Sequence, residues 1–337
     1  MSITAKEIAR LAGVSRGTVD RALKDRPGIS EETKKRILDI ADKYDYKPNI
    51  IGKALVYSGK PIRISVILNS IGNPFFDDVK AGIFAAQEEF ENYGFRISLF
   101  EFKGYDAENL VHLLDEVADE SEHIILTPIC DSRVEEKIRA LQKQSKNIIM
   151  LSSVLEGISN ALYVGCDYLK SGRIAGRITG LISGGCANLY IITGSSNHKG
   201  HAQRVEGIKE IMKKNYPSIH LVGVSESNDD DETAYLEMKD AFRNHPDIDF
   251  VYITAGGVNG TLKAVAEQKG DIRVCTFDDT EITRQALISG AVQATICQQP
   301  FEQGYYSIKS IFDTIVMKKE AQNTIHTQLS IKVDEAL

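Results

Sequence analysis

The sequence has no tryptophan and few cysteines, and its cysteines and histidines are not arranged as metal ligands. The five cysteines among 337 residues are odd in number and lack the paired spacing of zinc sites. The seven histidines show no metal spacing either. We therefore expect reduced, mostly buried thiols, no metal site and no cofactor.

The motifs of nucleotide-dependent and nucleophilic enzymes are also missing. No Gly-x-Gly-x-x-Gly follows an apolar run, no P-loop is present, and the pairs Gly184-Gly185 and Gly256-Gly257 are isolated. No catalytic group of residues is visible, so we expect no enzyme. An enzyme that acts on a sugar or a nucleoside is the alternative, which turnover of a bound candidate would support.

Long hydrophobic runs are absent. No segment approaches about 18 uninterrupted apolar residues, and the N-terminus lacks the apolar core of a signal peptide. These absences predict a cytoplasmic protein without a membrane partner.

Positive charge is concentrated near the N-terminus. Residues 1–60 contain 13 lysines and arginines against 8 acidic residues, whereas the remainder contains 27 against 39. A small basic module on a larger acidic body suits contact with nucleic-acid phosphates at one end only.

Residues 4–23 have the pattern of a helix, a tight turn and a second helix. Thr4 can cap the first helix, Gly13 allows the turn, and Ser15 can cap the second helix. A short helix held across another in this way is typical of DNA-binding proteins. The apolar positions expected to face inward are Ile8, Leu11, Ala12, Val19, Ala22 and Leu23.

A third helix and a linker follow. Ser30 can cap a helix from about Glu31 to Tyr44, with apolar positions at helical spacing. The next segment contains proline and glycine and is too short for a core of its own. We expect a headpiece at 1–47, a hinge helix and linker at 48–61, and a body at 62–337. The apolar positions of the third helix are Ile37, Leu38, Ile40 and Ala41.

From Ile62 onward, short and mostly β-branched apolar runs alternate with helical patterns, which predicts parallel sheets covered on both faces. One sheet would need too many strands, so we expect two lobes, lobe 1 at about 62–165 and 298–324 and lobe 2 at about 166–297 and 325–337. The runs are 64–68, 97–100, 124–126, 148–151, 189–192, 251–253, 274–277 and 294–297.

Polar residues that follow these runs should meet at the carboxyl ends of the strands, where such sheets bind ligands. Their carboxylates and amides suit a ligand rich in hydroxyls, such as a sugar, although each could instead cap the next helix. The run Asp229-Asp230-Asp231 predicts a solvated loop that leads into a helix, rather than a cation site. The candidates are Asn69, Asn73, Asp131, Asp167, Asn259, Asp278, Asp279, Gln298 and Gln299.

These residues resemble the LacI family of bacterial transcription regulators over the whole chain. Ala12-Gly-Val-Ser15 and Pro48-Asn49 look like that family's headpiece, and Asn73-Pro-Phe-Phe76 looks like a ligand-contact segment. The resemblance implies an all-α helix-turn-helix headpiece and a two-lobed α/β body with parallel sheets, similar to type I periplasmic sugar-binding proteins. It also implies a homodimer, a pseudo-palindromic operator and a small-molecule effector in the cleft, expected to be a sugar.

The resemblance assigns DNA contacts to the headpiece. Arg16 and Arg21 would read base edges, and Ser15 and Thr18 would contact phosphates. Gly17 stands where relatives often carry a base-reading side chain, so one contact would be missing. The remaining candidates are Thr4, Lys24, Asn49 and Leu55, the last of which matches a hinge leucine that wedges into the minor groove.

It assigns effector contacts to the body as well. Phe75 or Phe76 would stack on a ring face, while Arg204 and Asp278 would hold hydroxyl groups. Relatives place an asparagine or aspartate where this chain has Ala255-Gly256-Gly257, so that contact would be lost or moved. The other candidates are Asn73, Asp131, Gln298 and, as the replacement, Asn259.

The expected function is a ligand-responsive, sequence-specific DNA-binding regulator that represses genes of carbohydrate uptake or catabolism. One alternative is a sugar-binding protein for transport or signalling, against which the headpiece and the missing export signal both count. Another is a regulator that responds to a purine or a phosphorylated metabolite, for which Arg173 and Arg177 are available unless they lie on a helix face.

We predict that Arg21→Ala weakens specific DNA binding by about 1–3 kcal/mol and relaxes selectivity at one base step, because one base contact is lost. Titration of the operator and of single-base variants checks this. Unchanged affinity and selectivity would show that the recognition helix is wrongly assigned.

Overall fold

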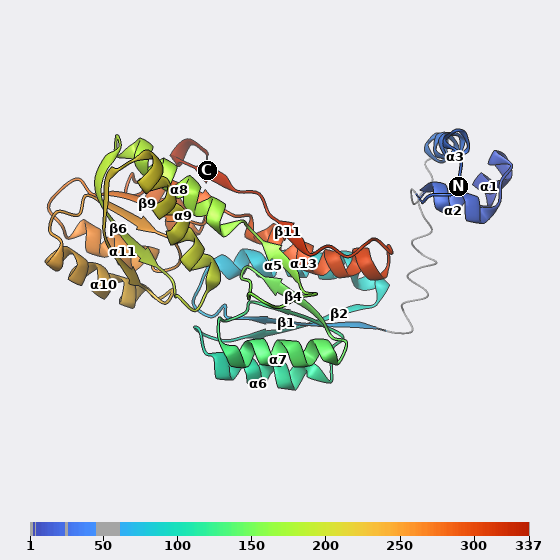
Figure 1. Ribbon diagram of the computed structural model, residues 1–337, viewed down its shortest axis with the longest axis horizontal. Coiled ribbons are helices and arrows are strands. Elements are labelled where there is room, and N and C mark those ends of the chain that lie inside the picture. The colour runs from blue at the N-terminus through green and yellow to red at the C-terminus, as the bar shows by residue number, and fades with distance from the viewer. Residues whose placement is uncertain (1–2, 4, 24–25, 45–60, 337) are drawn as a thin grey trace. The chain divides into compact units, whose positions relative to one another are not determined.

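The computed structural model describes residues 3, 5–23, 26–44 and 61–336. It divides into two units, an N-terminal helical unit and a body that begins at Ile62 (Figure 1). Several predicted DNA contacts, and all of the linker before Pro61, lie outside the described residues. These contacts are Thr4, Lys24, Asn49 and Leu55.

Three helices pack around a small apolar core in the N-terminal unit. Ser15 Oγ accepts the N–H of Thr18 at 3.1 Å, and Ser30 Oγ accepts the N–H of Thr33 at 3.3 Å. Both predicted caps are therefore confirmed. Gly13 provides the turn with a φ of 65°. The helices are α1 (Ala5–Ala12), α2 (Arg16–Leu23) and α3 (Glu31–Lys43).

The predicted apolar faces were wrong at two positions. Leu11 is 44% exposed and Leu38 is 36% exposed, whereas Ala9 is buried. At 3.6 residues per turn, Leu11 lies about 110° from the centre of the face that Ile8, Ala9 and Ala12 form. The short α1 covers only that face against its neighbours.

The body contains two six-stranded sheets, so the predicted two-lobed α/β architecture is confirmed. All neighbouring strands of lobe 1 run parallel, in the order β11-β5-β4-β3-β1-β2. The strands are β1 (Ile62–Leu68), β2 (Phe95–Glu101), β3 (His123–Leu126), β4 (Asn147–Leu151), β5 (Leu162–Gly165) and β11 (Thr324–His326).

The sheet of lobe 2 has the order β12-β10-β9-β8-β6-β7, and only the edge strand β12 runs antiparallel to its neighbour among the described strands. Parallel strands put their carboxyl ends on one edge of each sheet. The strands are β6 (Cys186–Thr193), β7 (Ser218–Glu226), β8 (Phe250–Ile253), β9 (Arg273–Phe277), β10 (Ala294–Cys297) and β12 (Ser330–Lys332).

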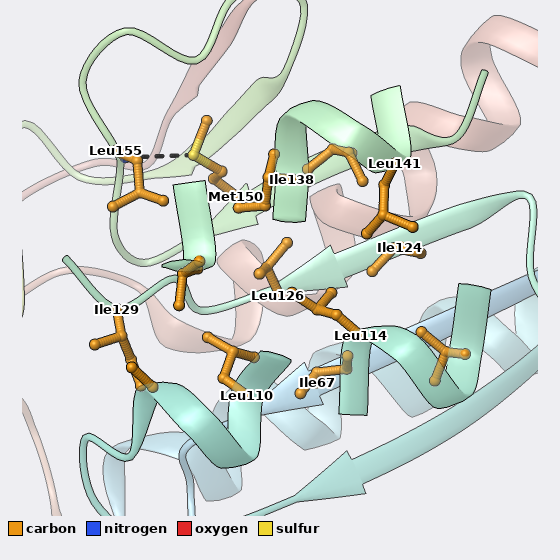
Figure 2. Close-up of a cluster of buried hydrophobic side chains, with 14 of the residues drawn as sticks. Ile67, Leu110, Leu114, Ile124, Leu126, Ile129, Ile138, Leu141, Met150 and Leu155 are labelled. Atoms are coloured by element: carbon orange, nitrogen blue, oxygen red, sulfur yellow. Dashed lines mark hydrogen bonds between the residues drawn. The ribbon is translucent and has the colours of Figure 1, made fainter. Parts of the chain in front are cut away.

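Helices cover both faces of each sheet. In lobe 1, α6 (Ala107–Ala118) and α7 (Ser132–Lys143) lie on one face, and α5 (Phe75–Phe90) and α13 (Pro300–Ile315) lie on the other (Figure 1). Figure 2 shows the apolar side chains between the sheet and α6 and α7, including Ile67, Leu110 and Leu126. The helices of lobe 2 are α8 (Tyr168–Ile182), α9 (Lys199–Asn215), α10 (Asp231–Asn244), α11 (Val258–Ala266) and α12 (Glu281–Ile288).

The chain passes between the lobes three times, at 166–167, 298–299 and 327–329. We call these segments the first, second and third crossovers. The third comes slightly later than the expected boundary at 325, because Thr324–His326 still pairs with β5 in lobe 1 and Ser330–Lys332 pairs with β10 in lobe 2.

In both lobes, glycines allow neighbouring helices to approach closely. A Cβ on Gly82 of α5 would lie 2.0 Å from the carbonyl oxygen of Phe301 in α13, and a Cβ on Gly304 would lie 2.0 Å from that of Val79. In lobe 2, a Cβ on Gly172 of α8 would lie 2.1 Å from the carbonyl oxygen of Arg204 in α9. These backbones leave no room for a side chain.

We predict that Gly82→Ala destabilises the body by about 1–3 kcal/mol or more, because the added methyl group meets the backbone of α13. Helix propensity alone would raise the free energy of unfolding by about 1 kcal/mol, because alanine favours a helix more than glycine does. The sign of the measured change therefore shows whether the steric clash outweighs helix propensity. Urea denaturation followed by circular dichroism measures it. Glu88→Ala, an exposed position of the same helix, should change stability by less than about 0.5 kcal/mol.

Candidate ligand-binding site

A cavity of about 240 Å³ lies between the lobes, at the carboxyl ends of their strands. Loops that follow β1, β2, β7, β8 and β9 line it, which is the position expected for a ligand site in parallel sheets. A smaller cavity of about 30 Å³ shares part of this lining. The polar and aromatic side chains that line both cavities are Asn69, Asn73, Phe75, Tyr105, Asp229 and Asp278.

Lobe 1 supplies an aromatic wall and an amide. The rings of Phe75 and Phe76 meet edge to face, with centroids 5.1 Å apart, and Asn73 Oδ1 accepts the N–H of Phe75 at 3.1 Å. Asn69 is buried, and its Oδ1 atom has no hydrogen-bond partner within the described part of the chain. A buried acceptor without a donor favours a ligand that donates a hydrogen bond there.

Arg204, on α9, is buried between two aromatic rings. Its Cζ lies 3.5 Å from the ring centre of Phe277 and 4.7 Å from that of Tyr168. Nη1 donates to the carbonyl oxygen of Thr254, while Nε has no partner among the described residues. The ring faces and the carbonyl offset the loss of hydration, so a charged side chain is tolerated beside the smaller cavity that it lines.

Asp278 is a buried carboxylate at the end of β9. Burial raises the pKa of Asp278 to about 6, although nearby Arg204 and a hydrogen bond from Gln298 both lower it. Gln298 Nε2 donates to Asp278 Oδ1 at 2.8 Å. No described residue bonds to Oδ2, so that oxygen is free to accept from a ligand.

Gln298 lies in the second crossover and is fully engaged with protein. Besides its bond to Asp278, its Oε1 accepts from Cys166 Sγ at 3.3 Å and from Gln303 Nε2 at 3.3 Å. Its carbonyl oxygen accepts from Thr327 Oγ1 at 2.8 Å and from Gln303 Nε2 at 3.0 Å. The expected ligand contact is thus also a link between all three crossovers.

Two histidines at this site were missed by the sequence reasoning. His198 and His201 stack with ring centroids 4.2 Å apart, and burial lowers the pKa of both, that of His201 to about 3. They are therefore neutral at pH 7. The spacing of three along α9 is the only sequence signal, and it is common on ordinary helices.

Asp229 and Tyr105 were missed as well. The Tyr105 hydroxyl in lobe 1 donates to Asp229 Oδ2 in lobe 2, across the cleft. Asp229 had been expected in a solvated loop. The loop does lead into a helix, because Asp230 caps α10 by accepting the N–H of Thr233 at 2.9 Å, but its neighbour Asp229 lines the cavity.

Several predicted contacts are not brought to the cavity. Asp131 caps α7, accepting the N–H of Arg133 at 2.9 Å and pairing with its guanidinium, and Asn259 is exposed on α11. Asp167 caps α8. Asp279 is held by ion pairs with Arg284 and Lys332. For Asp131, Asp167 and Asn259 the helix-cap or surface alternative describes the structure. Asp279 is held by one partner on the following helix and one on β12.

The arginines considered for a phosphorylated ligand lie outside both cavity linings. Arg173 pairs with Glu210 at 2.7 Å, and the guanidinium of Arg177 lies 5.9 Å from the ring centre of Tyr216. Both therefore belong to the surface of the α8 and α9 pair.

The second helix of the N-terminal unit presents its basic side chains to solvent. Arg16, Gly17 and Arg21 are exposed. Ser15 and Thr18 hydroxyls lie 2.9 Å apart at the start of α2. Asp20, which a phosphate would repel, lies 3.8 Å from Arg26. Such an exposed face at the start of a second helix is suited to the major groove.

Comparison with known families identifies both parts of the chain. Residues 64–319 match the periplasmic binding protein domain family, and residues 4–49 match the bacterial regulatory proteins of the lacI family. The chain belongs to the LacI family of regulators. This LacI-family protein is a ligand-responsive, sequence-specific DNA-binding regulator.

Full-length relatives agree with this assignment. The LacI-family protein is 24% identical over 323 residues to catabolite control protein A of Streptococcus mutans, covering 95% of this chain and 92% of that protein. It is 24% identical over 334 residues to the ribose operon repressor of Bacillus subtilis, covering 96% and 94%.

Solved structures show the same fold. GanP, a glucose-galactose binding protein from Geobacillus stearothermophilus, has a TM-score of 0.76 and 22% identity, and the match covers 82% of this chain and 99% of that one. A solute binding protein from Burkholderia graminis in complex with D-arabinose has a TM-score of 0.75 and 20% identity, with coverage of 81% and 96%. Among the described residues, no helix is long and apolar enough to cross a membrane.

We predict that Asp278→Asn removes a pH-dependent loss of about 3 kcal/mol from the free energy of unfolding. The pKa of Asp278 in the folded state lies above the ordinary value of 3.8, at about 6, so the stability that this group contributes is present at low pH and is lost as pH rises through about 6.

Urea denaturation of both proteins at several pH values from 4 to 7.5 measures the effect. The variant should gain stability relative to the native protein as pH rises from about 4 to about 6. A difference that stays constant over this range would contradict the prediction.

Proposed function

We propose that this regulator represses carbohydrate uptake or catabolism genes in the cytoplasm, as a homodimer on a pseudo-palindromic operator, and that a polyhydroxylated effector binds between its lobes. The observation that carries the effector class is the lining of the cavity. An orphaned amide oxygen, two carboxylates and a pair of phenylalanine rings suit hydroxyl donors and an apolar ring face.

Relatives support a carbohydrate. The curated relatives include a ribose operon repressor, and proteins of the same fold were solved with D-arabinose or D-allose bound. DNA recognition is supported by the lacI-family match and by the basic, exposed start of α2. Expected contacts to DNA are Thr4, Ser15, Arg16, Thr18, Arg21, Lys24, Asn49 and Leu55, with Gly17 leaving one contact unfilled.

The effector acts by changing the relation between the lobes. Direct contacts already cross the cleft: Cys130 N–H donates to the carbonyl oxygen of Asn197 at 2.8 Å, and Lys199 pairs with Glu156 at 2.8 Å. A ligand that binds one lobe arrangement better than another shifts the population of arrangements. DNA affinity follows only if the dimer reads that shift, and the coupling is reciprocal.

Two measurements test the proposal. A thermal-shift panel of pentoses, hexoses, polyols and nucleobases should contain a carbohydrate that stabilises the protein by about 2.7 kcal/mol at 100 times its dissociation constant. A gel shift on the upstream region of the protein's own gene should show salt-sensitive, sequence-specific binding that the same carbohydrate changes. A transport protein would be stabilised by a carbohydrate but would not bind the DNA. Stabilisation by a nucleobase alone would show that the effector is a nucleobase and not a carbohydrate.

A further inference from the structure

The loop that brings Asp229 to the cavity has a strained backbone. Asn228 and Asp229 have φ values of 52° and 58°, in the left-handed region that side chains other than glycine rarely adopt. Such conformations persist when the surrounding structure imposes them, and they concentrate at ligand sites. Asp278, the other carboxylate of the cavity, has a φ of 70°.

Two glycines make room for the Asp229 side chain. A Cβ on Gly256 would lie 2.9 Å from Asp229 Cα, Cβ and Oδ1, and a Cβ on Gly194 would lie 2.9 Å from Oδ1. Gly256 N–H donates to the same oxygen at 2.7 Å. Gly256, in the segment whose sequence suggests a lost polar contact, therefore admits a carboxylate from the neighbouring loop.

Other charged residues also line the two cavities, Lys103, Asp230 and Asp231 the larger one and Arg204 the smaller one. Lys103 is exposed to solvent. Asp230 accepts the N–H of Thr233 as a helix cap, and Asp231 Oδ1 accepts the N–H of Gly260 at 3.2 Å. Arg204 is buried between two rings and bonds to a backbone carbonyl. Asp229 and Asp278 are the two carboxylates that line both cavities, and each raises the cost of a further negative charge there.

The Tyr105 hydroxyl marks the place where a ligand donor would bind. Tyr105 is largely buried, and the pKa of its hydroxyl is raised well above its ordinary value, mainly by burial and by the charge of Asp229. The hydroxyl is therefore protonated and donates to Asp229 Oδ2. An effector hydroxyl can take over this donor position, whereas an anionic group cannot.

We propose that Asp229 is an effector-specificity residue of this regulator, which selects a hydrogen-bond donor on the ligand and rejects carboxylated and phosphorylated sugars. The inference rests on the proposed carbohydrate effector and adds the charge class of that effector. It assigns to Asp229 the polar contact that the Ala255–Gly257 segment lacks.

The test uses matched ligands on the full-length protein. Dissociation constants are measured by calorimetry for D-glucose and D-glucuronate, D-galactose and D-galacturonate, and D-ribose and D-ribose 5-phosphate. The preferred neutral sugar should bind at least about 100-fold more tightly than its anionic counterpart, because a third negative charge beside two carboxylates is unfavourable.

Asp229→Asn removes the charge while keeping an acceptor oxygen, and asparagine also tolerates a left-handed φ. This variant should bind the neutral sugar about 10-fold more weakly, and its affinity ratio between the neutral and the anionic sugar should fall by at least about 10-fold. Asp240→Asn, which makes the same charge change at an exposed position of α10 beside Arg243, should leave that ratio within about threefold. Thermal unfolding of each variant confirms that it is folded.

The outcomes separate the two proposals. An anionic sugar that binds as tightly as its neutral counterpart, or an Asp229→Asn ratio equal to that of the native protein, overturns the role of Asp229 and leaves the carbohydrate effector standing. A panel in which no sugar of either charge binds overturns both.

Discussion

The hydrogen bonds of Gln298 connect the crossovers between the two lobes with the ligand cavity. Its amide reaches Asp278 at the cavity and Cys166 in the first crossover, and its backbone carbonyl accepts from Thr327 in the third. Within the described residues the chain crosses between the lobes at these three places, so Gln298 links Asp278 to all of them. A buried polar network of this kind holds its geometry firmly when every member is satisfied.

The loops around the cavity also contain residues with strained backbone conformations. Asp229, Asp278 and Gln299 all have left-handed φ values, and each follows a strand of lobe 2 or lies in the second crossover. Burial raises the pKa of Asp278, and the charge of nearby Asp229 adds to that rise. The body tolerates this cost because its two sheets and paired helices bury large apolar clusters around the site.

Much of the architecture was predictable, and three of the four missed strands share a cause. Buried strands such as Ile124–Leu126 are recognisable as apolar runs. The edge strands β7, β11 and β12 are largely exposed or half-buried, so they lack such runs and were not predicted. The short inner strand β5 was missed as well, although it is mostly buried. Without β7, the loop that follows it could not be placed at the cleft, and Asp229 was assigned to solvent.

The sequence by itself determined the helix caps, the basic start of α2, the alternation of strands and helices and the strand-end candidates Asn69, Asn73, Asp278 and Gln298, because these depend on residues close together in the chain. Arg204 became a candidate only through the family resemblance. Tertiary structure alone decided which polar residues meet. Asp131 and Asn259 carry suitable groups but stay with their own helices, whereas Asp229 and Tyr105, 124 positions apart, form a bond across the cleft. Contacts between distant segments follow from how two lobes pack, and no local pattern records that packing.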